Sequence, residues 1–213
     1  MFTVEQVHKT FTDWAPRYNA THGWRLLKRR EARLALGVLA GDRVLEIACG
    51  TGLNFPHLRQ LIGDHGSLTG LDLTPAMLDI ARRQIARNGW KNVEVHEADA
   101  ARLPFPIASF DKIFCAFALN IIPEYERAIA EVWRVLVPGG RFVALEMRSM
   151  DVSSLSGRLG HLAHRLMGVC AVDTEHRSLD AIQTTFGEVQ VRRYLGGMVF
   201  IAVGTKQGKE SAK

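Results

Sequence analysis

Two hydrophobic patterns alternate through the middle of the chain. Short runs rich in β-branched and aromatic residues have the length and composition of strands. Longer stretches with helical periodicity separate them, and these cover Phe55–Leu61, Pro75–Asn88 and Pro123–Leu136. The five strand-like runs are "RVLEIA", "SLTGLDL", "VEVHEA", "FDKIFCAF" and "RFVALEM". Strand and helix in alternation predict βαβ units with right-handed crossovers and a mostly parallel sheet.

Residues typical of helix caps and helix ends support the predicted helix boundaries. Thr74 is a typical N-cap residue, with Pro75 at the first helical position, and Asn88-Gly89 supplies a stop signal. The run Pro138-Gly139-Gly140 is expected to end the third helix and to return the chain to a strand.

The C-terminal part of the chain departs from a plain doubly wound pattern. Two more strand-like runs, "VQVRRY" and "MVFIAV", are separated by Leu195-Gly196-Gly197, a hairpin signal. The last strand should therefore run antiparallel to its neighbour. The complete prediction is an α/β fold with a Rossmann-like, seven-stranded, mostly parallel sheet, an antiparallel C-terminal hairpin strand and helices on both faces.

Composition narrows the class of protein. Apolar and charged fractions are average, which argues against disorder, and no run approaches the ~20 apolar residues that span a bilayer. The first residues lack the pattern of a secretory signal. The three cysteines, Cys49, Cys115 and Cys170, are widely spaced, so we expect neither a disulfide framework nor a cysteine zinc site, and a cytoplasmic location.

The formal net charge of +5 is concentrated in the stretch "WRLLKRREAR". On a helix its arginines fall on one side and aliphatic residues on the other; the arginines are Arg29, Arg30 and Arg33, and the aliphatic residues are Leu27, Leu34 and Val38. Two interpretations stay open. The arginines form an ordinary solvated face, or they form a surface for an anionic membrane or an acidic substrate.

A glycine-rich turn, "ACGTG", follows the first predicted strand. In a parallel sheet, ligands bind outside the carboxyl ends of the strands, which places this turn at the ligand. The dinucleotide pattern G-x-G-x-x-G fails, because Ala48 and Leu53 occupy its first and third glycine positions. The spacing is instead Glu46-x-Ala48-x-Gly50-x-Gly52, in which two glycines let the backbone approach a bulky group.

An acidic residue also ends the second predicted strand. Asp72 lies about twenty residues after the glycine-rich turn, where a carboxylate can accept from both ribose hydroxyls of a nucleoside cofactor. That role serves any adenosine cofactor, so Asp72 alone does not identify one.

Five motifs in order resemble those of class I S-adenosylmethionine-dependent methyltransferases. They extend from Gly41 to Glu146 and read "VLEIACGTG", "LTGLDLTPAMLDIAR", "HEADAARLPFP", "FDKIFCAFALNIIP" and "EVWRVLVPGGRFVALE". The nearest branch is the ubiquinone/menaquinone-biosynthesis methyltransferase-like one, which includes quinone C-methylases and phospholipid N-methylases. The resemblance implies a single domain over 1–207. Its parts are an N-terminal helical lid (1–40), a cofactor-binding core (41–147), an acceptor-side insertion (148–179), a strand pair (188–205) and, beyond the domain, a flexible tail (208–213).

The resemblance also implies S-adenosylmethionine as cofactor and assigns residues to its parts. The methionine and ribose portions would meet Glu46, Ala48, Gly50 and Gly52, with alanine at 48 where many relatives carry glycine. The ribose hydroxyls would meet Asp72, the adenine ring Leu73 and Met77, and the adenine edge Asp99 and Ala100. The methionine carboxylate would lie close to Cys115 and Phe117.

Catalytic residues are harder to predict, since methyl transfer is an in-line displacement that depends largely on orientation. A general base is needed only if the acceptor keeps its proton near neutral pH. Residues that could face the methyl group come from three places. They are Tyr18, Asn19 and His22 before the core, Asn120 after the fourth strand, and Glu146 and Arg148 at the end of the fifth. Tyr18 is the leading one, because relatives carry a tyrosine in a comparable segment.

The leading functional prediction is a methyltransferase for a small-molecule acceptor. A phospholipid N-methyltransferase at the membrane surface is the alternative within the same chemistry. An NAD(P)-dependent oxidoreductase and a non-catalytic cofactor-binding subunit are alternatives of other classes. A nucleic-acid substrate is disfavoured, because "FALNIIP" stands where an N-P-P-Y motif would be. No metal is expected, because no glutamate accompanies His161 and His164 as in H-E-x-x-H; oligomeric state has no sequence signal.

Overall fold

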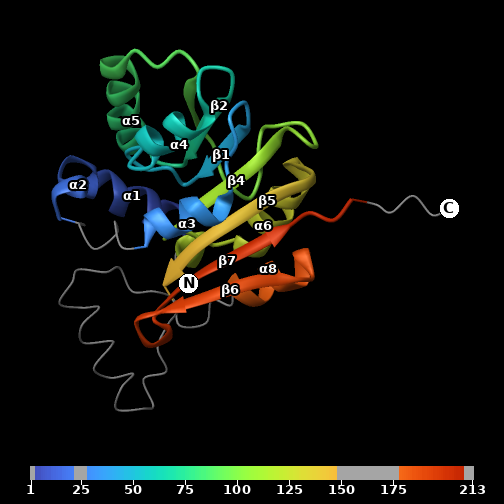
Figure 1. Ribbon diagram of the computed structural model, residues 1–213. Coiled ribbons are helices and arrows are strands. Elements are labelled where there is room, and N and C mark those ends of the chain that lie inside the picture. Colours follow the sequence, from blue (N-terminus) through green and yellow to red (C-terminus); the bar gives the residue numbers. More distant parts are fainter. Residues whose placement is uncertain (1–2, 22–27, 148–177, 209–213) are drawn as a thin grey trace.

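A seven-stranded sheet runs through the centre of the protein (Figure 1). The computed structural model describes residues 3–21, 28–147 and 178–208. The strand order is β3-β2-β1-β4-β5-β7-β6. The strands are β1 (Arg43–Ile47), β2 (Ser67–Asp72), β3 (Val93–Glu97), β4 (Phe110–Ala116), β5 (Leu136–Met147), β6 (Val189–Tyr194) and β7 (Val199–Thr205).

The direction of the strands confirms the predicted fold. The five strands from β3 to β5 are parallel, whereas β7 pairs antiparallel with both β5 and β6. The turn between β6 and β7 is the short 3₁₀ helix η4 (Leu195–Gly197), in which Gly196 has a φ of 65°. A left-handed conformation of this kind favours glycine, which explains why the Gly-Gly pair was a reliable hairpin signal.

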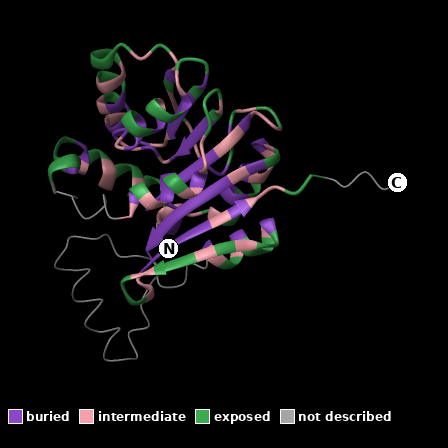
Figure 2. Cartoon of the chain, in the orientation of Figure 1, coloured by how far each residue is buried: buried purple, intermediate pink, exposed green. Residues whose placement is uncertain are grey.

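Helices cover both faces of the sheet (Figure 1). One face packs α3 (Arg29–Leu36), α4 (Phe55–Ile62) and α5 (Pro75–Asn88). The other packs α6 (Tyr125–Val135) and α8 (Ser178–Phe186). The buried central strands therefore read as apolar runs, as parallel strands covered on both faces do. Figure 2 shows the central strands buried, while the edge strand β6 is largely exposed or half-buried.

Four further helical segments of the described chain lie outside these two layers. At the N-terminus, α1 (Val4–Trp14), η1 (Ala15–Arg17) and α2 (Tyr18–Thr21) follow one another, and α1 and η1 contact α5. A 3₁₀ turn, η3 (Leu119–Ile121), follows β4.

One predicted boundary is wrong. The third predicted helix was expected to run to Leu136, with the return to a strand after Pro138-Gly139-Gly140, but α6 ends at Val135 and β5 begins at Leu136. Phe110 already pairs with Leu136, and the register between β4 and β5 then shifts before Lys112 pairs with Arg141. The Pro-Gly-Gly run therefore lies within the strand as an irregularity, a position that proline and glycine tolerate.

Candidate functional site

A cavity opens at the carboxyl edge of the sheet, where the loops after β1, β2, β3 and β4 meet the N-terminal helices. Its empty space, counting the open mouth, is about 710 Å³. Helices α1, α2 and α5 contribute Val4, Val7, Phe11, Tyr18 and Met77 to the lining. The strand ends and the segments after them contribute Ala48, Gly50, Leu71, Asp72, Leu73, Thr74, Ala98, Asp99, Ala100, Ala116, Phe117, Ala118, Ile121, Ile122 and Pro123.

The glycine-rich turn after β1 forms the floor of this cavity in a left-handed conformation. The φ angles are 50° at Ala48, 57° at Gly50 and 77° at Gly52. At Gly52 a Cβ atom would lie 2.7 Å from the ring of Phe55, the first residue of α4. Glycine at 52 is therefore required by both its backbone and the close approach of α4.

Ala48 pays a conformational cost that glycine would avoid. The left-handed conformation destabilises a folded L-residue by roughly 1–2 kcal/mol. Glycine avoids this strain, but its greater freedom in the unfolded chain lowers the free energy of unfolding by about 0.4–1 kcal/mol. We expect Ala48→Gly to raise the free energy of unfolding by up to about 1 kcal/mol, measured by urea denaturation. A decrease would contradict this, and would mean that the packing of the methyl group outweighs the strain.

Asp72 is fixed by the two loops on either side of it. Its Oδ2 accepts from the backbone N–H of Gly50 at 2.8 Å, and its Oδ1 accepts from that of Thr74 at 2.9 Å. Burial raises the pKa of this carboxyl, although both hydrogen bonds favour the charged form. Hydrogen bonds from the Thr74 side chain and the Leu73 backbone also favour the charged form, and Asp72 lines the cavity.

Asp99 is fixed in a similar manner after β3. Its Oδ1 accepts from the N–H of Ala101 at 2.9 Å, which closes a local turn. Asp99 lines the cavity together with Ala98 and Ala100. A second acidic group thus faces the same space as Asp72, one strand further along the sheet.

Glu46 lies beneath the glycine-rich turn and is only 2% exposed. Its Oε1 accepts from Asn54 Nδ2 at 2.6 Å, whereas its buried Oε2 has no hydrogen-bond partner within the described residues. Burial raises the pKa of Glu46 to about 7, against the opposing effect of the Asn54 hydrogen bond and of Arg29 and Arg33. A buried carboxylate oxygen without a donor is costly, so this position calls for a donor from a ligand.

The prediction that the arginine side of the basic helix α3 is exposed is wrong. Arg29 and Arg33 are 5% and 9% exposed, whereas Leu34 is 61% exposed. Arg33 Nη1 donates to Asn54 Oδ1 at 3.0 Å, and the Arg29 guanidinium lies 5.5 Å from the centroid of the Phe117 ring. The cause is electrostatic, because the buried Glu46 carboxylate needs nearby cations. Two of the three arginines proposed for anionic lipid thus face inward.

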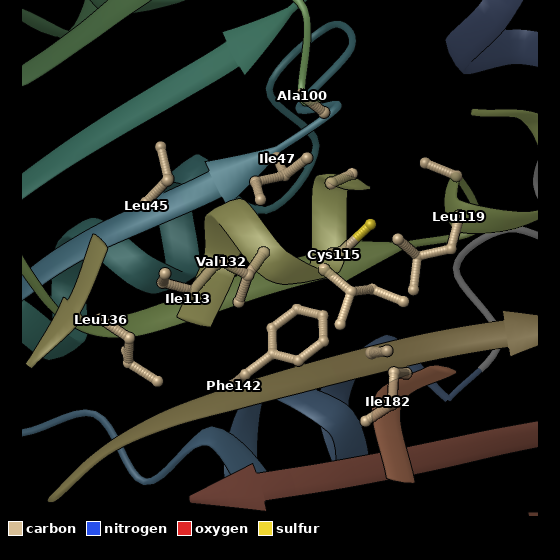
Figure 3. Close-up of a cluster of buried hydrophobic side chains, with 14 of the residues drawn as sticks. Leu45, Ile47, Ala100, Ile113, Cys115, Leu119, Val132, Leu136, Phe142 and Ile182 are labelled. Carbon is tan, nitrogen blue, oxygen red and sulfur yellow. The ribbon is translucent and has the colours of Figure 1, made fainter. Parts of the chain in front are cut away.

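Most of the predicted cofactor contacts converge on the cavity. Ala48, Gly50, Asp72, Leu73, Met77, Asp99, Ala100 and Phe117 all line it. The lining omits Glu46, Gly52 and Cys115. Side chains alternate along β4, so Cys115 points into the core beneath α6, and Figure 3 shows it there among Ile113, Leu119 and Phe142. Burial raises the pKa of this thiol well above its usual range.

The candidate catalytic residues occupy different environments. Tyr18 lines the cavity and is 8% exposed, with its ring 6.4 Å from that of Phe11. Asn120 is buried outside the lining, because its Nδ2 donates to the carbonyl of Met147 and its Oδ1 accepts from Ser178 Oγ at 3.2 Å. His22, Arg148, His161 and His164 lie outside the described residues, as do the acceptor-side positions 148–177.

Sequence reasoning missed one wall of the cavity. Val4, Val7 and Phe11 project from one side of α1 into the lining. Their spacing of three and four residues is the apolar stripe of an amphipathic helix, and this signal was available in the sequence. Ile121, Ile122 and Pro123, which follow β4, were also not identified as lining residues.

Comparisons with known proteins agree with this geometry. A family model described as a methyltransferase domain matches residues 44–140. A ubiquinone/menaquinone biosynthesis C-methyltransferase from Teredinibacter turnerae is 33% identical over 203 residues, which cover 85% of this chain and 81% of that relative. The chain belongs to the class I S-adenosylmethionine-dependent methyltransferases, in the branch of these quinone-biosynthesis enzymes.

Two further comparisons define the extent of the similarity. A demethylmenaquinone methyltransferase from Listeria monocytogenes is 33% identical over 153 residues, and the match spans 70% of this chain and 65% of that relative. The crystal structure of a SAM-dependent methyltransferase from Aquifex aeolicus superposes with a TM-score of 0.70 at 19% identity, covering 91% of this chain and 97% of that one. The second similarity concerns the fold alone.

Family membership makes S-adenosylmethionine the cofactor and sets aside the NAD(P)-dependent oxidoreductase. The residues present fit this group, because the partnerless Glu46 oxygen and the Asp72 carboxylate offer acceptors to its ammonium and hydroxyl groups. These relatives do not favour the phospholipid alternative. None of the helices in the described ranges is long and apolar enough to cross a membrane. Within the same ranges, no group of three or more His, Cys, Asp and Glu side chains could hold a metal ion.

Proposed function

We propose that this methyltransferase transfers a methyl group from S-adenosylmethionine to a ring carbon of a hydroquinone-type acceptor. The observation that carries the proposal is the apolar part of the cavity lining. Val4, Val7 and Phe11 of α1 form it together with Ile121, Ile122 and Pro123 after β4. A planar aromatic ring with an aliphatic tail matches such a lining, and the names of the relatives from Teredinibacter turnerae and Listeria monocytogenes refer to quinone acceptors.

The roles of the residues follow from their position. Glu46 and the glycine-rich turn would hold the methionine end of the cofactor, Asp72 its ribose, and Asp99 with Ala100 its adenine edge. When bound, the cofactor supplies an electrophilic methyl group on a sulfonium centre. With the cofactor bound, the electron-rich ring carbon would accept this methyl group, S-adenosylhomocysteine would be the co-product, and the displaced ring proton would pass to solvent or to a base.

Tyr18 is the catalytic candidate that lines the cavity. Its ring packs in one buried cluster with Met77, a residue assigned to the adenine, and with Phe11, a residue of the apolar lining. We propose that the Tyr18 side chain orients the acceptor by contacting the hydroxyl group of its ring.

The test combines binding with turnover. Adenosylhomocysteine should raise the thermal midpoint, since a ligand at about 100 times its Kd adds roughly 2.7 kcal/mol to stability, whereas NADH should not. The protein is then incubated with methyl-labelled S-adenosylmethionine and either a demethylated naphthoquinol with a short isoprenoid tail, the same compound in its oxidised form, or phosphatidylethanolamine vesicles. Products are identified by mass spectrometry.

Each outcome has a distinct meaning. Methylation of the quinol but not of the oxidised quinone supports the proposal, because only the reduced ring is a carbon nucleophile. Methylation of phosphatidylethanolamine alone would overturn the acceptor assignment. Adenosylhomocysteine binding without any product from the panel would contradict it too, and would favour a non-catalytic cofactor-binding subunit.

A further inference from the structure

We infer that Glu146 is a positioning residue for the acceptor, because its buried carboxylate fixes the loop after β4 that forms one wall of the cavity. The inference rests on the proposed function, since it assigns that wall to the acceptor. Glu146 lies near the end of β5 and is fully buried, and it does not itself line the cavity.

The carboxylate of Glu146 holds two consecutive backbone amides. Its Oε1 accepts from the N–H of Ala118 and from that of Leu119, both at 2.9 Å. The Cys115 Sγ atom lies 4.0 Å from the same oxygen. Hydrogen bonds to a charged acceptor are roughly twice as strong as neutral ones, so a buried carboxylate is a stiff anchor for this loop.

The loop needs such an anchor because its first residue is strained. Phe117 has a φ of 58°, a conformation that a bulky L-residue rarely adopts, and its N–H donates to the carbonyl of Leu145 at 2.7 Å. Strained residues persist only where the surrounding structure over-determines them. Leu145 and Glu146, adjacent on β5, thus fix three successive amides of the loop.

This loop supplies a large share of the cavity wall. Ala116 to Ala118 and Ile121 to Pro123 all line it, on the side formed by β4. Of the acidic residues assigned to the cofactor, Asp72 ends β2 and Asp99 follows β3. A shift of the loop would therefore move the acceptor wall, together with Phe117 near the methionine carboxylate, and would leave the ribose and adenine positions in place.

Asn120 forms a second anchor for the same loop. Its side chain connects the Met147 carbonyl at the end of β5 with Ser178 at the start of α8. The two anchors explain why a buried asparagine and a buried glutamate stand close to the cavity without lining it. They also give Asn120 a positioning role in place of direct contact with the methyl group.

The test is Glu146→Gln, which keeps the size of the side chain and removes its charge. Weakening two charge-assisted hydrogen bonds should lower kcat/KM for the quinol by at least about tenfold, with part of the loss in KM. The Kd of adenosylhomocysteine, measured by calorimetry, should stay within about threefold of the wild-type value.

The matched control is Glu131→Gln. Glu131 Oε2 also accepts from a backbone N–H, that of Leu103 at 2.9 Å, but neither residue lines the cavity. This variant should lose stability without a change in KM. A Glu146→Gln enzyme with wild-type KM and kcat would overturn the inference, as would an equal change in KM for the Glu131 variant.

A measurement without turnover separates this inference from the proposed function. Hydrogen exchange at the amides of Ala118 and Leu119 should be slow in the ligand-free wild type and much faster in Glu146→Gln. Rapid exchange in the wild type would overturn the anchoring role, even if the variant did not fold. If no quinol is methylated but these amides lose protection in the variant, the proposed acceptor fails and the anchor stands.

Discussion

Replacing Asp72 with alanine is expected to lower the affinity for adenosylhomocysteine by at least about 100-fold, measured by isothermal titration calorimetry. Two ribose hydroxyls would lose a charged acceptor, and a hydrogen bond to a charged group contributes about 1.5–3 kcal/mol. The same substitution releases the N–H groups of Gly50 and Thr74, which Asp72 holds at 2.8 and 2.9 Å. Both effects act on the wall of the cavity.

The control distinguishes loss of a ligand contact from general loosening. Asp42 Oδ2 also accepts from a backbone N–H, that of Leu39 at 2.8 Å, in a turn outside the cavity lining. Asp42→Ala should lower the thermal midpoint and leave adenosylhomocysteine affinity unchanged. Near-normal affinity of Asp72→Ala would contradict the assignment of the ribose to Asp72, and with it the position of the cofactor in this cavity.

The strand order and the position of the cavity could be predicted because local patterns and the sheet architecture agree. β1 and β4 are buried on both faces and read as apolar runs, while Gly196 marks the hairpin through its left-handed backbone. A turn at the carboxyl end of a parallel strand lies at the ligand, so Gly50 and Asp72 could be placed before any coordinate was known.

Other features depend on contacts between distant elements and left no local signal. Periodicity placed the arginines of α3 on one helix face, but it could not show that this face meets Glu46 and Asn54 rather than solvent. Asn120 follows β4 in a position typical of catalytic residues, yet its side chain bonds to Met147 and Ser178. The distance in sequence between Asn120 and Ser178 explains why no pattern could reveal this pairing.

The buried Glu46 side chain lowers the stability of the ligand-free protein near neutral pH. Its folded-state pKa of about 7 exceeds the ordinary value of 4.5 because burial disfavours the charged form. The folded state therefore binds the proton more tightly than the unfolded chain, so this group lowers stability as pH rises from about 4.5 to about 7. Arg29 and Arg33 reduce this cost, and Asp72 increases it.

Glu46→Gln should change ligand-free stability and cofactor affinity in opposite directions. Relative to the wild type, the variant should gain up to about 3 kcal/mol between pH 5 and pH 8, since each pKa unit corresponds to about 1.4 kcal/mol. Its glutamine oxygen can still accept from Asn54, so the comparison isolates the charge. Urea denaturation at pH 5 and at pH 8 gives the free energy of unfolding of the variant relative to the wild type. An equal difference at both pH values would contradict the prediction.

Affinity should move the other way, because the partnerless Oε2 of Glu46 is assigned to the ammonium of the methionine moiety. In the wild type, an ionised Glu46 binds that ammonium, so adenosylhomocysteine affinity should rise with pH and level off above about 7. Glu46→Gln should lose the rising limb and bind at least about tenfold more weakly at pH 7.5. Calorimetry in buffers of different ionisation enthalpy should also show a proton released on binding to the wild type below pH 7 and a smaller release in the variant. If wild-type affinity instead falls steadily from pH 5, Glu46 meets the ligand as a neutral donor and the ammonium lies elsewhere.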